Sequence, residues 1–344
     1  MGLEFFLFSI LFVFLTMGLG LVVALFIRGI DRKLTAHMQA RIGPPLRQPF
    51  LDIGKLFGKD TIIPENSIPW LYNLAPIACF ASAATLLFYI PLGSLDSVLA
   101  GRGDLVLLTY LLLLPSLALT LGGFASGSPY ATVGAQREMV TMVSYEFPII
   151  IGVVALAWQM TMLFPFDPNL YAFSLSAFSA HLVWAEVGLF GWVGLALILF
   201  VFLLVTTGEL AKVPFDVGEA ETEIAGGLLA EYSGRNLALF YLGDCIKAVA
   251  MGGIIVAIFF PFNLSPLLSI SGLQANAVDL LFFFVKIIIV LFFSLMLIRV
   301  GVARLKINQV VDVQWFTFSL ICIMGLLLVW VDPWLSPVLG ILGG

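Results

Sequence analysis

Long apolar segments, separated by shorter polar ones, make up this chain from end to end. An α-helix needs about 20 apolar residues to cross a bilayer, and eight segments reach about that length. Because the apolar residues are continuous and do not alternate with polar ones, the pattern argues against a transmembrane β-barrel. We therefore predict an all-α polytopic membrane protein, a single integral membrane domain over residues 1–344. The predicted transmembrane helices are residues 4–27, 70–90, 105–125, 141–163, 183–207, 237–260, 279–299 and 314–332.

The polar segment after the first predicted helix contains a shorter repeat, in which apolar residues recur every three or four positions. The stripe is Leu46, Phe50, Ile53 and Phe57, and the charged residues beside it are Asp52, Lys55 and Lys59. This spacing predicts a short amphipathic helix in the membrane interface. A helix that only fills a gap between neighbouring transmembrane helices would show the same pattern, and the two interpretations are compatible.

The composition agrees with a protein that has lipid as its solvent: 61% of the residues are hydrophobic and only 11% are charged. Soluble domains have about 45–50% apolar and about 25% charged residues. Cys79, Cys245 and Cys322 each fall inside an apolar segment without CxxC spacing, so we expect packed core residues. His37 and His181 are far apart in the sequence. Iron–sulfur and zinc sites need clustered ligands, so we expect no redox centre, catalytic residue or metal site in this chain.

The basic residues are distributed unevenly between the two sides. Of the 16 basic residues, 13 fall in or beside alternate loops: Arg28, Arg32, Lys33, Arg41, Arg47, Lys55, Lys59, Arg137, Lys212, Arg235, Arg299, Arg304 and Lys306. The opposite side has Arg102 alone, and Lys247 and Lys286 lie within predicted helices. The positive-inside rule then predicts that both termini face outward and that the first, third, fifth and seventh loops are cytoplasmic.

The fifth loop is unusually acidic. Its six carboxylates are Glu209, Asp216, Glu219, Glu221, Glu223 and Glu231. A solvated acidic loop would be the plain interpretation, but apolar residues such as Val217, Ile224 and Leu228 are interleaved and indicate that part of the segment is packed. Crowded, packed carboxylates bind protons more tightly, which suits groups that load and release protons near neutral pH.

Further ionisable residues lie within or beside the apolar segments. Glu138 and Glu146 are near the cytoplasmic start of the fourth predicted helix, and the others are Glu186, Asp244, Lys247 and Lys286. Each such group costs several kcal/mol near the middle of a membrane, so it normally faces a partner or a hydrated interior path. One residue alone could form a structural ion pair. A series that continues an acidic loop favours a polar conduit entered from the cytoplasmic side.

Motifs along nearly the whole chain closely resemble the H-type membrane subunit shared by respiratory complex I and the membrane-bound group 4 [NiFe] hydrogenases. They are Gln39-Ala-Arg-Ile-Gly-Pro-Pro, Gln48-Pro-Phe-Leu-Asp-Ile-Gly-Lys-Leu-Phe57, Gly134-Ala-Gln-Arg-Glu, Ser144-Tyr-Glu146, Pro214-Phe-Asp, Glu231-Tyr-Ser-Gly234, Arg304-Leu-Lys-Ile-Asn-Gln309 and Trp315. Any one of these motifs alone would be weak, but together and in order they are highly specific.

In that family the subunit joins the membrane arm to the peripheral redox arm. The resemblance implies an acidic proton path through Glu146, Glu209, Glu219, Glu221, Glu223, Glu231 and Asp244. The residue pattern adds Glu138, Asp216 and Lys247 to the expected path. The residues expected at the junction with the peripheral arm are Arg41, Arg47, Asp52, Lys55 and Arg137. At position 244 the complex I pattern has Glu, so this chain keeps the charge on a shorter side chain.

The first loop departs from the complex I pattern. Complex I subunits usually have a longer stretch here, whereas Gly-Pro-Pro-Leu-Arg-Gln-Pro runs directly through residues 43–49. Since that loop shapes the quinone entrance in complex I, its shortness favours the hydrogenase branch. The alternative is the same subunit in a quinone-reducing or sulfur-reducing complex.

The resemblance therefore implies a coupling subunit of a ferredoxin-dependent hydrogenase in a prokaryotic cytoplasmic membrane, which moves H⁺ or Na⁺. The [NiFe] centre and the Fe–S clusters would belong to partner chains: the hydrogenase large and small subunits and an Fe–S subunit. Antiporter-like membrane subunits would complete the complex. An autonomous secondary transporter is disfavoured because the sequence shows no inverted repeat and no clear pair of broken helices. A passive anchor would leave the acids within the helices unexplained.

Overall fold

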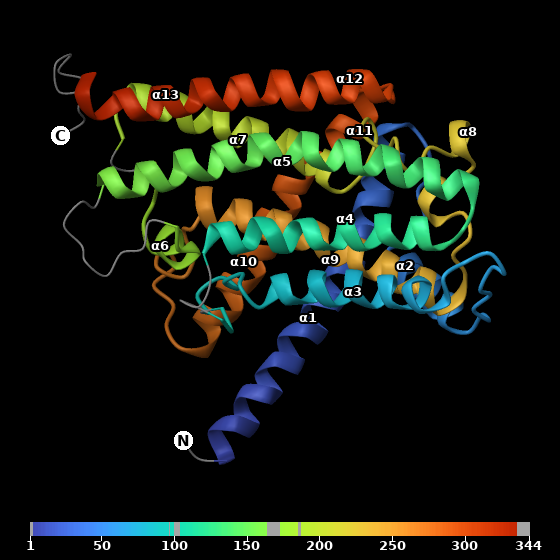
Figure 1. Ribbon diagram of the computed structural model, residues 1–344. Coiled ribbons are helices and arrows are strands. Elements are labelled where there is room, and N and C mark those ends of the chain that lie inside the picture. The colour runs from blue at the N-terminus through green and yellow to red at the C-terminus, as the bar shows by residue number, and fades with distance from the viewer. Residues whose placement is uncertain (1–2, 96, 100–103, 164–172, 185–186, 336–344) are drawn as a thin grey trace.

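The computed structural model describes residues 3–95, 97–99, 104–163, 173–184 and 187–335 (Figure 1). Eight of its helices are long and apolar enough to cross a membrane, which confirms the predicted fold class. They are α1 (Leu3–Met38), α3 (Pro69–Leu87), α4 (Leu105–Ala125), α5 (Pro129–Leu163), α7 (Leu189–Glu209), α9 (Gly234–Phe259), the continuous helix of α10 (Leu273–Leu291), η2 (Phe292–Met296) and α11 (Leu297–Gly301), and that of α12 (Ile307–Val311), η3 (Asp312–Phe318) and α13 (Ser319–Leu335).

Four short helices complete the described elements: α2 (Gln48–Phe57), α6 (Leu175–Ala180), α8 (Glu221–Ile224) and the 3₁₀ turn η1 (Gly227–Leu229). Local sequence explains several helix starts. Pro49 and Pro69 occupy first-turn positions of α2 and α3, where the missing N–H is not needed. Asp104 caps α4 by accepting a hydrogen bond from the N–H of Leu107 at 2.7 Å.

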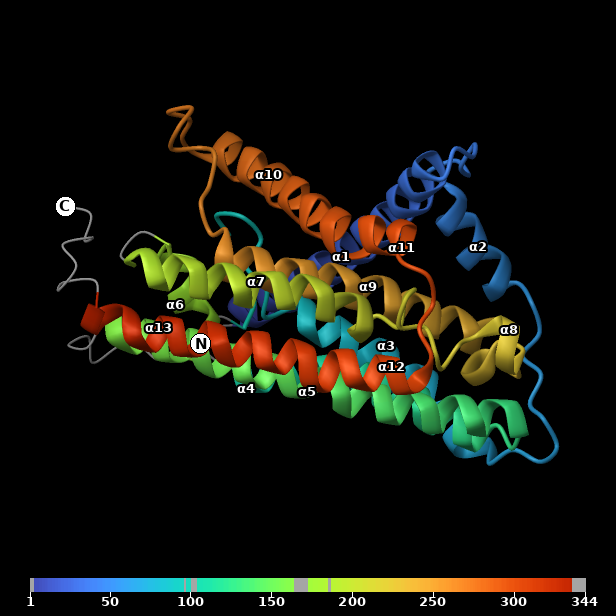
Figure 2. The same cartoon turned by 90° about the horizontal axis from the view of Figure 1, so that it is seen from above.

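Helix α9 forms the centre of the bundle. In its most apolar stretch 89% of the residues are buried, against 56% or less in each of the other membrane-spanning helices. It packs against α1, α2, α3, α4, α7 and α10, and both views show it running through the middle of the molecule (Figures 1 and 2). A helix surrounded by protein can carry ionisable side chains away from lipid, which is where Asp244 and Lys247 lie.

Several predicted helix boundaries are wrong. Helix α1 continues beyond residue 27 to Met38, so Arg28 and Arg32 lie on a helix and not in a loop. Helix α5 begins at Pro129 and not at residue 141, which places Arg137 and Glu138 inside it. Apolar length marks only the lipid-facing part of a helix, and hydrogen bonding carries the helix further into polar sequence. Helix α7 begins six residues later than predicted and ends at Glu209. Two residues of the sequence analysis, Glu186 and Arg102, lie outside the described residues.

The short amphipathic helix is confirmed as α2, and only part of its predicted apolar stripe packs against the bundle. Pro49 and Leu56 are buried against the bundle, whereas Phe50 and Phe57 are exposed. Ile53 of the predicted stripe also packs against the core, and the same face turns Asp52 toward the protein interior.

The three cysteines are buried and unpaired, as predicted for packed core residues: Cys79, Cys245 and Cys322. Each lies on a different helix, and Cys79 packs against Gly243 of α9.

Candidate functional site

A cavity of about 680 Å³ opens among the helix ends where most of the basic residues gather. Its wall includes parts of α1, α2, α4, α5, α7, α9 and α11, and of the loop of residues 210–233, called the acidic loop below. Of the ten residues predicted for the proton path, seven line this cavity: Glu138, Glu209, Asp216, Glu219, Glu221, Asp244 and Lys247. Asp52 and Lys55 of the predicted junction line it as well.

Close backbone packing brings the acidic loop onto α5. A Cβ atom on Gly134 would lie 2.7 Å from the carbonyl oxygen of Gly218, and a Cβ atom on Gly218 would lie 2.7 Å from Oε2 of Glu138. Because the atoms that face Gly134 belong to the backbone, only glycine fits there. Gly134 and Glu138 are one helical turn apart on α5, so the turn that receives the loop backbone also presents the Glu138 carboxyl beneath it.

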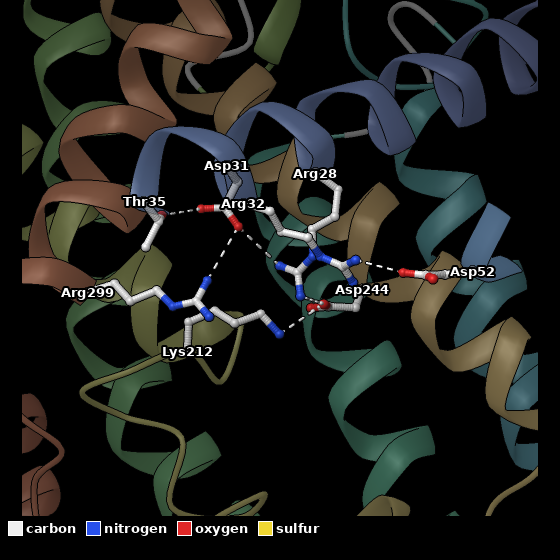
Figure 3. A network of polar contacts seen from close by, with 8 residues as sticks. All are labelled: Arg28, Asp31, Arg32, Thr35, Asp52, Lys212, Asp244 and Arg299. Atoms are coloured by element: carbon white, nitrogen blue, oxygen red, sulfur yellow. Dashed lines mark hydrogen bonds and ion pairs between the residues drawn. The ribbon is translucent and has the colours of Figure 1, made fainter. Parts of the chain in front are cut away.

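One ion-pair network ties α1 to three other parts of the chain (Figure 3). Asp244 of α9 pairs with Lys212 of the acidic loop at 2.9 Å and lies 3.8 Å from Arg28 of α1. Arg28 also lies 3.6 Å from Asp31, whose carboxylate is 3.5 Å from Arg299 of α11. Asp31 is buried, and its two arginine partners compensate the cost of burying its charge.

A second pair joins α1 to α2. Arg32 donates a hydrogen bond of 2.7 Å to Asp52, which also accepts one of 2.9 Å from Gln48 (Figure 3 shows the pair). The arginine hydrogen bond holds the pKa of the Asp52 carboxyl below its usual range. Lys55 is 4.0 Å from the same carboxylate and largely exposed.

The deepest charges in the cavity are Lys247 of α9 and Glu209 at the end of α7. Their Nζ and Oε1 atoms are 2.6 Å apart, and both side chains are almost completely buried. The same ammonium group donates to the hydroxyl of Ser116 at 2.6 Å and to the backbone carbonyl of Glu209 at 2.7 Å. Ser116 in turn accepts a hydrogen bond of 3.2 Å from the buried hydroxyl of Tyr145. The ammonium group therefore donates two hydrogen bonds and lies beside the Glu209 carboxylate as its counter-ion.

At the rim of the cavity, arginines hold the acidic loop. Arg304, which follows α11, binds both carboxylate oxygens of Asp216 and donates to the hydroxyl of Thr222 at 2.9 Å. This bidentate hydrogen bonding raises the pKa of Arg304. Arg137 of α5 pairs with Glu223, which is largely exposed.

Glu138 and Glu219 differ from these acids. Neither has an ion-pair partner within the described ranges, and Oε2 of Glu138 is buried without a hydrogen bond. Glu138 is 1% exposed, whereas Glu219 is half-buried in the cavity wall. Burial raises the pKa of Glu219, with Lys212 opposing and Asp244 reinforcing the effect.

The remaining predicted residues lie elsewhere. Glu146 is half-buried on α5 and does not line the cavity, and Glu231 is exposed. Arg41 and Arg47 are exposed in the segment between α1 and α2. Among the described residues, no group of three or more His, Cys, Asp and Glu side chains could hold a metal ion.

The predicted site residues do not include several members of these ion-pair networks: Arg28, Asp31, Arg32, Arg299 and Arg304. For Arg28, Asp31 and Arg32 the sequence contains a signal that could have placed them together. Residues 28–38 contain no proline, so the first helix could continue, and the spacing of Arg28, Asp31 and Arg32 then places them on one helical face. For Arg299 and Arg304 no local signal distinguishes a cavity residue from an ordinary cytoplasmic arginine.

Comparison with known proteins agrees with this architecture. The NADH dehydrogenase family matches residues 10–330. The chain belongs to this family. The relatives include hydrogenase-4 component C of Escherichia coli, which is 34% identical over 85% of this chain and 87% of its own length. The H-type subunit of the NADH-quinone oxidoreductase of Syntrophotalea carbinolica is 30% identical over 88% of each chain.

A solved structure resembles this family member over almost its full length. A chain of the membrane-bound sulfane sulfur reductase, an archaeal respiratory membrane complex, superimposes with a TM-score of 0.78 at 28% sequence identity. The match covers 94% of this chain and 99% of the other. The chain is therefore a multi-pass membrane subunit of the type found in complex I-like and hydrogenase-type oxidoreductase complexes.

Proposed function

We propose that this chain is the membrane-anchor and coupling subunit of a ferredoxin-dependent, ion-translocating membrane-bound [NiFe] hydrogenase. The observation that carries the coupling role is the cavity, in which ionisable side chains continue from the exposed rim at Glu221 to the buried pair of Glu209 and Lys247. The hydrogenase branch is supported by the similarity to hydrogenase-4 component C and by the short first loop.

In this proposal the chain itself transfers no electrons. Hydrogenase large and small subunits and an Fe–S subunit carry the [NiFe] centre and the clusters, and ferredoxin supplies the electrons. The charged groups of the cavity either pass protons toward antiporter-like subunits or act on those subunits through their electric field. The antiporter-like subunits then move H⁺ or Na⁺. A proton crossing 100 mV costs about 2.3 kcal/mol, so the relay needs only a modest redox span for each ion.

The proposed location is a prokaryotic cytoplasmic membrane, with both termini outside and the cavity end in the cytoplasm. Support comes from the basic residues, since the loops between α1 and α3 and between α7 and α9 lie at the same end of the bundle (Figure 1). The side chains of Arg41 and Arg47 are exposed at that end, where their positive charges can contact the peripheral arm.

The experiment is purification of the intact complex in mild detergent through a tag on this chain. The preparation is assayed for nickel, for H₂ evolution from reduced ferredoxin and for quinone reduction. Nickel together with H₂ evolution would support the proposal. A nickel-free complex that reduces a quinone or a sulfur compound would refute the hydrogenase branch.

A second candidate is the equivalent membrane chain of a quinone-reducing or sulfur-reducing complex. It is favoured by the structural similarity to the sulfane sulfur reductase and by the sequence similarity to the H-type chains of NADH-quinone oxidoreductases. The partner that corresponds to the hydrogenase large subunit discriminates the two candidates. A complete set of four cysteine ligands for [NiFe] in that partner supports the first, and its loss supports the second.

A further inference from the structure

The buried and half-buried acids that line the cavity fall into two groups according to their partners. Four are held by a lysine or an arginine within ion-pair distance: Asp52, Glu209, Asp216 and Asp244. Two others, Glu138 and Glu219, line the same cavity and have no ion pair in the part of the chain that the structure describes. Glu221 is exposed at the rim, where water solvates its charge. The sequence cannot make this division, because all of them are simply carboxylates near basic residues.

The division has a chemical consequence. A cation in contact favours the ionised carboxylate, so a paired acid keeps its negative charge and does not carry a proton. An isolated carboxylate buried away from water is too costly to remain charged and takes up a proton instead. Glu138 is 1% exposed, and its Oε2 atom has no hydrogen-bond partner among the described residues. A buried, unpartnered oxygen of this kind fits a group that gains and loses a proton.

Glu138 and Glu219 are also neighbours. Oε2 of Glu138 lies directly against Gly218, the residue before Glu219. The charged groups that face Glu138 are Glu219 and Lys212 of the acidic loop, Glu209 of α7 and Lys247 of α9. The two lysines are already engaged, Lys212 with Asp244 and Lys247 with Glu209. Within the described part of the chain, no cation is therefore left to hold Glu138 as an anion.

We propose that Glu138 and Glu219 form the proton-exchanging pair of this cavity, while the cation-paired acids supply a fixed field. The inference rests on the proposed proton path and assigns its mobile members. At rest Glu138 carries the proton and Glu219 is the carboxylate. In the step, the O–H bond of Glu138 breaks and an O–H bond forms on Glu219, directly or through water in the shared cavity. The transfer itself leaves the pair with one proton and one negative charge. A pH jump changes that number through Glu219, which is half-buried, whereas Glu138 is 1% exposed.

Infrared difference spectroscopy of the intact complex tests the assignment, because a protonated carboxyl has a C=O stretch that a carboxylate lacks. The probe is a pH jump in light and heavy water, so no electron donor is needed. The variants are Glu138→Gln, Glu219→Gln and the ion-paired control Asp216→Asn; Glu65→Gln serves as an exposed acid outside the cavity.

We expect one deuterium-sensitive carboxyl band to be lost in Glu138→Gln and retained in Asp216→Asn and Glu65→Gln. In Glu219→Gln the band of Glu138 persists, but its response to the pH jump is lost because the acceptor is gone. Glu138→Asp keeps a carboxyl and should shift the band without removing it, which separates a protonation role from a packing role. A band that persists in Glu138→Gln, or that disappears in Asp216→Asn, would overturn the proposal.

Ion uptake by the same preparations in sealed vesicles separates this inference from the proposed function. If the wild-type complex moves no ions but the variants still assign the carboxyl band to Glu138, the proposed coupling role is refuted and the proton-exchanging pair is supported. If the wild type moves ions and Glu138→Gln does so equally well with its band intact, the pair fails and the coupling role stands.

Discussion

The buried pair of Lys247 and Glu209 offers the sharpest test of how this cavity is held together. In Lys247→Met the side chain keeps its length but loses its charge, and Glu209 is left without a cation among side chains that exclude water. Breaking a buried ion pair in this way costs about 3–5 kcal/mol, because the remaining charge is uncompensated. The side chains are 4% and 2% exposed, so solvent does little to reduce this cost.

The cost depends on the carboxylate that is left behind, which a double variant demonstrates. In Lys247→Met combined with Glu209→Gln no uncompensated charge remains, and we expect most of the lost stability to return. Glu209→Gln alone leaves Lys247 bound to the hydroxyl of Ser116 and to a carbonyl, so it should cost less than Lys247→Met.

Cys245 provides a local assay, because this buried thiol is two residues from Lys247 on α9. Alkylation of Cys245 in the intact complex, followed by mass spectrometry at increasing temperature, reports the opening of this region. Cys322 on α13 is an internal reference that should respond less. If Lys247→Met protects Cys245 as well as the wild type does, water already solvates Glu209, and the argument from a dry pair is refuted.

Three further predictions concern the walls of the cavity. Gly134→Ala places a methyl group 2.7 Å from the backbone carbonyl oxygen of Gly218, and we expect a loss of about 1–3 kcal/mol, seen as a lower thermal midpoint of the complex. Arg32→Gln removes the hydrogen bond that lowers the pKa of Asp52; the loss, about 0.5–1 kcal/mol at neutral pH, should disappear as the pH falls through that lowered pKa. Burial raises the pKa of Glu219, so ionising it destabilises the fold: Glu219→Gln should match the wild type in acid and exceed its thermal midpoint at alkaline pH.

Controls distinguish these effects from general damage. Gly54→Ala on α2 meets no atom within 4 Å and has an ordinary helical backbone, so it should not lower the thermal midpoint and should raise it slightly. An equal loss in Gly54→Ala and Gly134→Ala would contradict the close backbone packing of α5 and the acidic loop. A stability difference for Arg32→Gln that does not change with pH would contradict the assigned role of Asp52. A lower midpoint of Glu219→Gln at alkaline pH would contradict a half-buried Glu219 without an ion pair.

The sequence alone determined the class of the molecule and most of its helices. Runs of about 20 apolar residues have no stable place in water, so their number and length already predict a bundle that crosses a membrane. The motifs and their order identified the family, since the motifs extend along nearly the whole chain. The helix ends were less certain: hydropathy reports contact with lipid, whereas a helix continues for as long as its backbone hydrogen bonds do, as α1 does through Arg28, Arg32 and beyond.

Only the tertiary structure decided which charges meet. Arg299 lies far from Asp31 in the sequence, and Lys247 lies 38 residues from Glu209, yet each pair is in contact across two helices. Because a carboxyl is ionised or protonated according to its neighbours, its chemistry cannot be assigned before those neighbours are known. The distinction between the paired Asp216, held by an arginine, and the unpaired Glu138, lying against a glycine, therefore arises from packing and not from residue type.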